Sequence, residues 1–135
     1  MRVLAVVAAL ALAASAAQAR SNPDCPRGLK PMISAELFFG ADQVGGGQVD
    51  ETAWTHFLDT EVTPRFPEGL TTWVADGRWR APSGAPTHER SRVLLLLISP
   101  DAATRARLEA VRTAYRIQFH QLSVGLVEHR ECAGF

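Results

Sequence analysis

The 135-residue sequence contains only two cysteines, Cys25 and Cys132. They do not form a CxxC pair, which is the usual arrangement of a redox dithiol and a common part of a structural zinc site. The four histidines show neither HxxxH nor HExxH spacing. A metal site needs three or four converging ligands, and the pattern offers none. We therefore expect no metal and no cofactor.

Motifs of nucleotide-binding proteins and serine hydrolases are also missing. The segment GADQVGGG at residues 40–47 places two glycines at P-loop spacing. However, glycines stand where a P-loop has its lysine and Ser/Thr. Asp50 and Glu51 follow this segment, and their charges would repel an anion from a helix N-terminus. No serine lies in a GxSxG motif, so the sequence supports neither nucleotide binding nor a serine triad.

No excess of one charge is present. The chain has 14 basic and 14 acidic residues, and Lys30 is the one lysine among the basic residues. Such a balanced chain creates no field that would attract nucleic acid or an anionic membrane. We expect neither of these as a partner.

The only long apolar run lies at the N-terminus. Residues 3–14 follow Arg2 and are too few to span a bilayer comfortably, and residues 17–19, Ala-Gln-Ala, match a signal-peptide cleavage site. We expect a signal peptide at residues 1–19 and one exported domain at 20–135, periplasmic or extracellular, with no membrane segment after cleavage. In an oxidising compartment, Cys25 and Cys132 would form one disulfide.

Four segments of the remaining chain have the composition of β-strands. They are residues 32–39, 70–80, 92–99 and 122–130. Within the second segment, Asp76-Gly77 predicts either a β-bulge or a tight hairpin turn.

Two further segments have apolar residues at helical spacing. The first helix should begin after Asp50, a good N-cap, and end near Pro64, because proline disfavours helical dihedrals at the preceding residue. The second should begin after Ser99, with Pro100 at its first position.

The resulting order β-α-β-β-α-β predicts a ferredoxin-like α+β fold, a four-stranded antiparallel sheet with two helices on one face. In this topology the first and last strands are neighbours. Cys25 precedes the first strand and Cys132 follows the last, so the expected disulfide supports the same fold. Closing a loop of roughly 100 residues is worth about 4–5 kcal/mol in the chain-entropy model.

The third strand, RVLLLLIS, is apolar on both of its faces. Two helices can cover only one face of the sheet, and a large apolar patch is unusual on a monomer. We expect the second face to be covered either by a second copy in a homodimer or by a loop or hairpin of the same chain.

Residues 63–71, TPRFPEGLT, resemble the signature of a bacterial family catalogued as domain of unknown function 3574. The segment ELFFG at 36–40 also matches, as do single residues along the chain: Trp54, Phe57, Gly77, Trp79, Arg80, Glu89, Tyr115 and Phe119. Glu68 stands where the family pattern has aspartate, and His120 where it has glycine. The resemblance implies a small exported protein and brings no established activity.

Within the signature, Pro67 and Gly69 favour a turn between core residues Phe66 and Leu70. Charged residues of this turn would then brace it or contribute to a binding site. The candidate binding residues combine these charges with residues of the neighbouring strands: Arg65, Glu68, Trp73, Trp79 and Arg92.

Glu36 is the candidate catalytic residue, since it lies midway along a strand expected in the centre of the sheet. A carboxylate there must be paired or protonated if it is buried. It could form a structural ion pair with Arg92 or Arg65, or act as acid or base in a cavity on the open side of the sheet. The favoured function is a non-catalytic binding or interaction module, and the alternative is a cofactor-independent enzyme using Glu36.

Overall fold

The computed structural model describes residues 24–135, so the expected signal peptide at 1–19 lies outside the described residues. A π-helical turn, η1, continues the first helix without a break. The elements in chain order are β1 (Lys30–Gly40), α1 (Glu51–Phe57), η1 (Leu58–Val62), β2 (Thr71–Arg80), β3 (Pro86–Ile98), α2 (Ala102–Gln118) and β4 (Gly125–Ala133). None of the helices in this part of the chain is long and apolar enough to cross a membrane.

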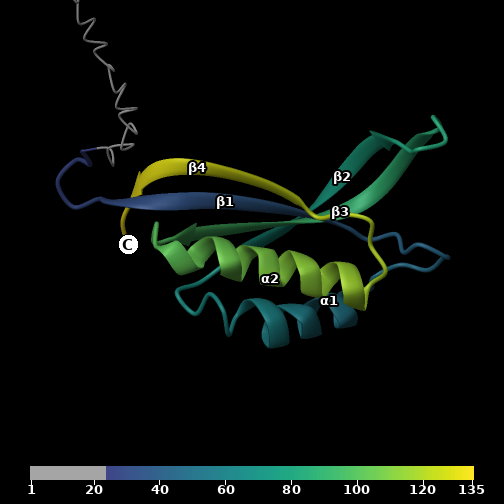
Figure 1. The fold of residues 1–135 in the computed structure, drawn as a ribbon, viewed down its shortest axis with the longest axis horizontal. Coiled ribbons are helices and arrows are strands. Elements are labelled where there is room, and N and C mark those ends of the chain that lie inside the picture. Colours follow the sequence, from purple (N-terminus) through teal and green to yellow (C-terminus); the bar gives the residue numbers. More distant parts are fainter. Residues whose placement is uncertain (1–23) are drawn as a thin grey trace, which may run out of the picture.

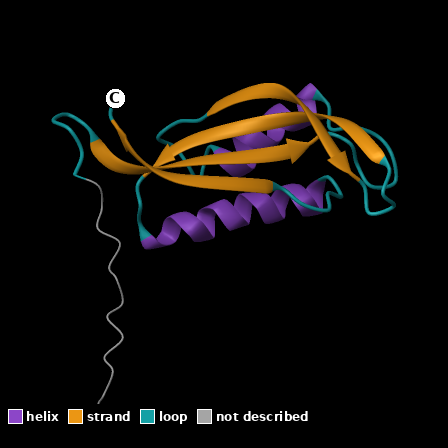
Figure 2. Cartoon of the chain, turned by 90° about the horizontal axis from the view of Figure 1, so that it is seen from above, coloured by secondary structure: helices purple, strands orange, loops and turns teal. Residues whose placement is uncertain are grey.

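The four strands form one antiparallel sheet in the order β2-β3-β1-β4. Both helices pack on the same face of this sheet (Figure 1). In the view from above, no helix lies in front of the strands (Figure 2). The ferredoxin-like fold predicted from the order of elements is confirmed.

The first and last strands are neighbours, as the cysteine positions predicted. Pro31 pairs with Cys132 across the β1–β4 ladder. Cys25, which precedes β1, forms a disulfide with Cys132 across 107 residues of sequence. The bond therefore ties both ends of the domain together at one end of the sheet.

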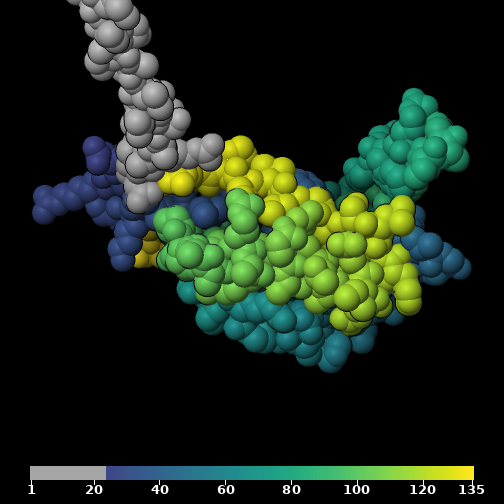
Figure 3. Space-filling view, in the orientation of Figure 1, coloured from purple at the N-terminus to yellow at the C-terminus, as the bar shows by residue number. Residues whose placement is uncertain are grey.

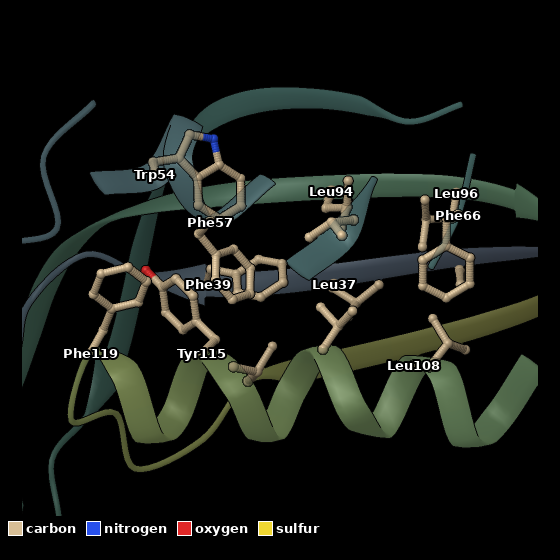
Figure 4. Close-up of a cluster of buried hydrophobic side chains, with 14 of the residues drawn as sticks. Leu37, Phe39, Trp54, Phe57, Phe66, Leu94, Leu96, Leu108, Tyr115 and Phe119 are labelled. Carbon is tan, nitrogen blue, oxygen red and sulfur yellow. The ribbon is translucent and has the colours of Figure 1, made fainter. Parts of the chain in front are cut away.

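The core lies between the sheet and the helices. From β1, Ala35, Leu37 and Phe39 point toward the helices and are fully buried. They meet a cluster from the other strands and both helices that includes Trp54, Phe57, Phe66, Leu94, Leu96, Leu108, Tyr115 and Phe119 (Figure 4). Apolar residues at strand and helix periodicity thus account for the layer packing.

Asp50 caps α1 as predicted, because its carboxylate accepts a hydrogen bond from the Ala53 N–H at 2.8 Å. The prediction for Thr63 was wrong, since this residue keeps helical dihedrals (φ −56°, ψ −41°) although Pro64 follows it. The Thr63 N–H donates to the Leu58 carbonyl at 2.8 Å, a π-helical hydrogen bond that holds it in place.

The signature stretch forms the expected turn. Gly69 N–H donates to the Phe66 carbonyl at 3.3 Å, which puts Pro67 at the first central position. Gly69 has a φ of 127°, a backbone conformation that favours glycine. Phe66 is buried, and Leu70 packs against the core cluster.

Asp76-Gly77 forms neither a bulge nor a hairpin turn. Both residues pair in register with β3, and the chain turns instead at residues 81–85. A Cβ at Gly77 would stand 2.9 Å from the Ser91 Oγ, so glycine leaves room for the Ser91 side chain.

Several boundaries differ from the sequence prediction. β1 begins at Lys30, and β4 extends to Ala133, so Cys132 lies within β4 and does not follow it. β3 begins at Pro86 because it pairs with β2 over its whole outer half, and β4 begins only at Gly125. The N-cap of α2 is Asp101 instead of Ser99, because the Asp101 carboxylate accepts from the Thr104 N–H at 2.8 Å. The Ser99 carbonyl accepts from the Thr104 hydroxyl at 2.7 Å.

Candidate functional site

The face of the sheet opposite the helices carries exposed apolar side chains. Strand alternation and register place Phe38 and Trp73 on either side of Val93 on this face. Four large side chains here are between 40% and 44% exposed, namely Phe38, Trp73, Trp79 and Val127. We call this surface the open face.

The rest of the described chain leaves the centre of the open face uncovered. The outer part of the β2–β3 hairpin projects away from the body of the molecule (Figures 1 and 3). The hairpin and the glycine-rich loop, which comprises residues 41–49 between β1 and α1, instead form the walls of a hollow at one end of the face.

Two hollows lie on the open face. One, of about 550 Å³, is bordered by the signature turn at Glu68 and by Lys30, Met32, Leu95 and Leu97 of the sheet. We call it the turn pocket. The second, of about 380 Å³, lies at the opposite end of the sheet and is the aromatic pocket.

The aromatic pocket is built from all four strands and two loops. Phe38 lies above Gly125 of β4, where a Cβ would come within 3.2 Å of the Phe38 Cβ. Trp79 and Glu89, from the β2–β3 hairpin, form another wall. Asp42 and its neighbours in the glycine-rich loop, together with the loop between α2 and β4, complete the rim.

Glu89 is fixed in this pocket by two hydrogen bonds. One carboxylate oxygen accepts from the Trp79 indole N–H at 3.1 Å, and the other accepts from the Asp42 backbone N–H at 3.0 Å. The carboxylate lies directly against Gly40, where a Cβ would stand only 2.2 Å from Glu89 Oε1. Glycine at this position therefore makes room for the carboxylate.

Tyr115 contacts Gly40 from the helical side of the sheet. Its hydroxyl donates to the Gly40 carbonyl at 2.8 Å. Burial raises the pKa of the Tyr115 phenol above its ordinary value, so the hydroxyl stays protonated and remains a donor. Gly40 is thus held between the carboxylate of Glu89 and the phenol of Tyr115.

Glu36 lies in the middle of the open face, opposite Leu95 on one side and Val127 on the other. It is half-buried. It forms no hydrogen bond or ion pair with any other residue that the structure describes. Its carboxylate therefore faces the space above the sheet.

The ion pair that Glu36 was expected to form with Arg92 or Arg65 is not present among the described residues. Arg92 points to the helical side of the sheet, where it pairs with Glu51 at 2.7 Å and lies over the Trp54 ring at 5.4 Å. Arg65 binds the Glu61 carboxylate at 2.9 Å. Both arginines instead form ion pairs with glutamates of α1 and η1.

The structure thus brings only part of the predicted set together. Trp79 lines the aromatic pocket, Trp73 lies toward the centre of the open face, and Glu68 borders the turn pocket at the other end. Glu89 and Asp42 were not among the predicted site residues. Glu89 was among the residues that resemble the family. Its contact with Trp79 depends on the register in which Gly77 pairs with Glu89, and this register was not visible in the sequence.

No group of three or more His, Cys, Asp or Glu side chains within residues 24–135 is arranged to hold a metal ion. On the open face, the groups available to a ligand are aromatic rings, the fixed carboxylate of Glu89 and hydroxyl groups.

Solved structures that are similar in fold include two of a phage SAM lyase. A phage SAM lyase in complex with S-methyl-5'-thioadenosine is 15% identical, with a TM-score of 0.59 over 76% of this chain and 90% of that chain. A phage SAM lyase in the apo state is 17% identical, with a TM-score of 0.55 over 78% and 92% of the two chains. At these identities the likeness shows the fold alone.

A comparison with curated proteins gave no match. A family model described as "Protein of unknown function (DUF3574)" matches residues 34–135, which include every strand and helix except the start of β1. The match agrees with the resemblance seen in the signature stretch, and the chain belongs to this family.

Proposed function

We propose that this protein is an exported, non-catalytic binding module and that the open face is its binding surface. The observation that carries the proposal is the exposure of Phe38, Trp73, Trp79 and Val127 on one uncovered sheet face. Contiguous apolar patches on small proteins commonly mark interaction sites. Aromatic side chains supply large contact areas for such binding.

The aromatic pocket is preformed, which favours binding. Its two rim loops are joined by hydrogen bonds, from Gln121 Nε2 to the Asp42 carbonyl at 2.7 Å and from the Val44 N–H to the His120 carbonyl at 3.3 Å. The indole of Trp79 is held by Glu89. A pocket whose walls are already ordered loses less entropy when a ligand binds.

Export is supported by two features. The Cys25–Cys132 disulfide is formed, and disulfides persist mainly in oxidising compartments. The N-terminal apolar run followed by Ala-Gln-Ala has the pattern of a cleaved signal peptide.

For the centre of the open face we propose a second copy of this chain as partner, sheet against sheet. Trp73 and Val127 are exposed there, and Leu95 beside them is only half-buried. A homodimer across this region would remove these side chains from water and leave the aromatic pocket at the end of the sheet.

A thermal-shift screen of small molecules against residues 20–135 tests the binding function. Ligands that raise the melting temperature should lose their effect in Phe38→Ala or Trp79→Ala. They should keep it in Ile117→Ala, a matched control because Ile117 is a 73% exposed apolar residue on α2. If every ligand found stabilised the open-face variants as much as the wild type, this surface would not be the binding site.

A second candidate is a cofactor-independent enzyme in which Glu36 acts as acid or base. It is favoured by the half-buried, unpaired state of Glu36 among the described residues. A ferredoxin-like neighbour, the phage SAM lyase, bears the name of an enzyme, which is an analogy at the level of fold. Mass spectrometry of each screened ligand after incubation should then show a product with wild type and none with Glu36→Gln. Recovery of every ligand unchanged would favour the binding module.

A further inference from the structure

We propose that the aromatic pocket binds a small organic cation with an alkylated ammonium group, using Phe38 and Trp79 as aromatic walls and Glu89 as the counter-charge. This inference rests on the proposed binding function and names the class of ligand. It is carried by the charge, the aromatic surface and the geometry of the pocket.

The charge of the pocket is one-sided. Asp42 and Glu89 are among the residues that line it, and no Lys, Arg or His of residues 24–135 is. Neither carboxylate forms an ion pair with another described residue. The nearby hairpin arginines, Arg80 and Arg90, alternate to the opposite side of the strands. The pocket is therefore suited to a cation and unsuited to an anion.

The aromatic walls add a second attraction for a cation. Phe38 is 40% exposed and Trp79 is 43% exposed, so both rings are accessible to a ligand. The face of an aromatic ring attracts a cation within about 6 Å of its centre, and alkylated ammonium groups are typical ligands of such rings. An alkylated ammonium also suits these rings because its methyl groups are apolar.

The carboxylate of Glu89 is positioned and still has room for a ligand. Its two oxygens each accept one N–H hydrogen bond, from Trp79 and from Asp42. Each carboxylate oxygen has a further lone pair, so both oxygens can still interact with a ligand charge. The hydroxyls of Thr87, Ser91 and Ser123 also line the pocket and can bind a polar group of the ligand. The volume of about 380 Å³ is within the range of ~300–1,000 Å³ typical of small-molecule sites.

A purely structural role would require Glu89 only to tie the hairpin to the glycine-rich loop. That role explains the two hydrogen bonds. It does not explain why a half-buried carboxylate without an ion-pair partner among the described residues lies beside two exposed aromatic rings.

Choline and its uncharged carbon isostere, 3,3-dimethylbutan-1-ol, test the inference with residues 20–135 by isothermal titration calorimetry. Choline should bind, and the isostere should bind about tenfold more weakly or not at all, because it lacks the charge. Glu89→Gln keeps a hydrogen-bond acceptor and should weaken choline binding about tenfold. Asp59→Asn is the control, since it removes the same charge from an exposed side chain of η1, outside the open face, and should leave choline affinity unchanged.

Phe38→Leu provides a second variant that leaves the hydrogen bonds of Glu89 in place. It should also weaken choline binding about tenfold while the far-UV circular dichroism stays that of the wild type. If Glu89→Gln fails to fold, Phe38→Leu still tests the inference.

The outcomes separate the two proposals. Equal binding of choline and the isostere, or no binding of choline, would overturn the cation site. In either case the open face would remain the proposed binding surface if other ligands from the thermal-shift screen depended on Phe38 and Trp79. An equal loss of choline affinity in Asp59→Asn and Glu89→Gln would show a general charge effect and would also overturn the site.

Discussion

At Gly40, a single methyl group would collide with the carboxylate of Glu89. Gly40 therefore contacts two residues that are far from it in sequence, since Glu89 lies on one side of it and Tyr115 donates to its carbonyl from the other. Glu89 also holds Trp79, so the same contacts order a wall of the aromatic pocket.

The sequence placed Trp79 among the candidate site residues, whereas Glu89 was noted only as a residue that resembles the family. Their contact depends on the register between β2 and β3, and the register depends on where the hairpin turns. A turn at Asp76-Gly77 would have paired Trp79 with residues of its own strand. The actual turn at 81–85 brings it to Glu89.

Tyr115 gives a prediction for how the stability of the fold changes at alkaline pH. Because burial raises its pKa above the unfolded value of about 10, its contribution to stability is fully present below pH ~10 and is lost as the pH rises above it. It is the only tyrosine in the sequence. Ultraviolet absorbance should therefore show tyrosinate only when the protein unfolds, as followed by circular dichroism.

Tyr115→Phe is the control for this titration, and it should lower the free energy of unfolding at pH 7 by about 1–2 kcal/mol, because the Gly40 carbonyl loses its donor. Tyrosinate formation near pH 10 in a protein that is still folded would contradict the assignment.

At the scale of elements, local sequence signals located the strands and helices better than their ends. β3 extends back to Pro86 although its outer half is polar, because the residues opposite it in β2 complete a long ladder. The apolar run at 92–99 marked only the part of this strand that lies over the core. Backbone pairing in the hairpin depends on the partner strand and not on apolar residues.

The N-cap of α2 gives a prediction at acidic pH. Desolvation opposes the shift, but hydrogen bonds from Thr104 and the charge of Arg107 hold the pKa of Asp101 below its ordinary value. The stabilisation by ionised Asp101 is therefore present above the unfolded pKa of about 3.9 and is lost as the pH falls through the folded value.

Asp101→Asn should lower the thermal midpoint at pH 7 and match the wild type at the lowest pH at which both fold, because it keeps the cap and loses the charge. Asp101→Ala, which loses the cap as well, should be less stable throughout. A constant difference between wild type and Asp101→Asn at all pH values would show that the charge has no role.

For the whole molecule, the disulfide contributes by restricting the unfolded chain. Cys25 and Cys132 are separated by 107 residues, and closing a loop of this size is worth about 4–5 kcal/mol in the chain-entropy model. The double variant Cys25→Ser/Cys132→Ser should lose stability of this order in urea denaturation. The wild type under reducing conditions should behave in the same way. An unchanged denaturation midpoint in both would mean that the bond does not stabilise the fold.

Self-association is the second prediction for the whole molecule. Light scattering of residues 20–135 should report a dimer, because the centre of the open face exposes Trp73 and Val127. Val127→Glu should shift the mass to that of a monomer, whereas Ile117→Glu on α2 should not. A strictly monomeric wild type at micromolar concentration would remove the second copy as partner.

The sequence alone determined the order of strands and helices, the link between Cys25 and Cys132, and membership of the family, because periodicity, capping residues and signature motifs are local properties. Only the tertiary structure decided which side chains meet. Arg92 was expected beside Glu36 but points to the opposite side of the sheet, and Glu89 was overlooked but lies in the aromatic pocket. The physical reason is that strand register determines the neighbours and the facing of each residue. The β2–β3 register, set by the turn at 81–85, brings Glu89 to Trp79, and the β1–β3 register places Arg92 on the face opposite Glu36.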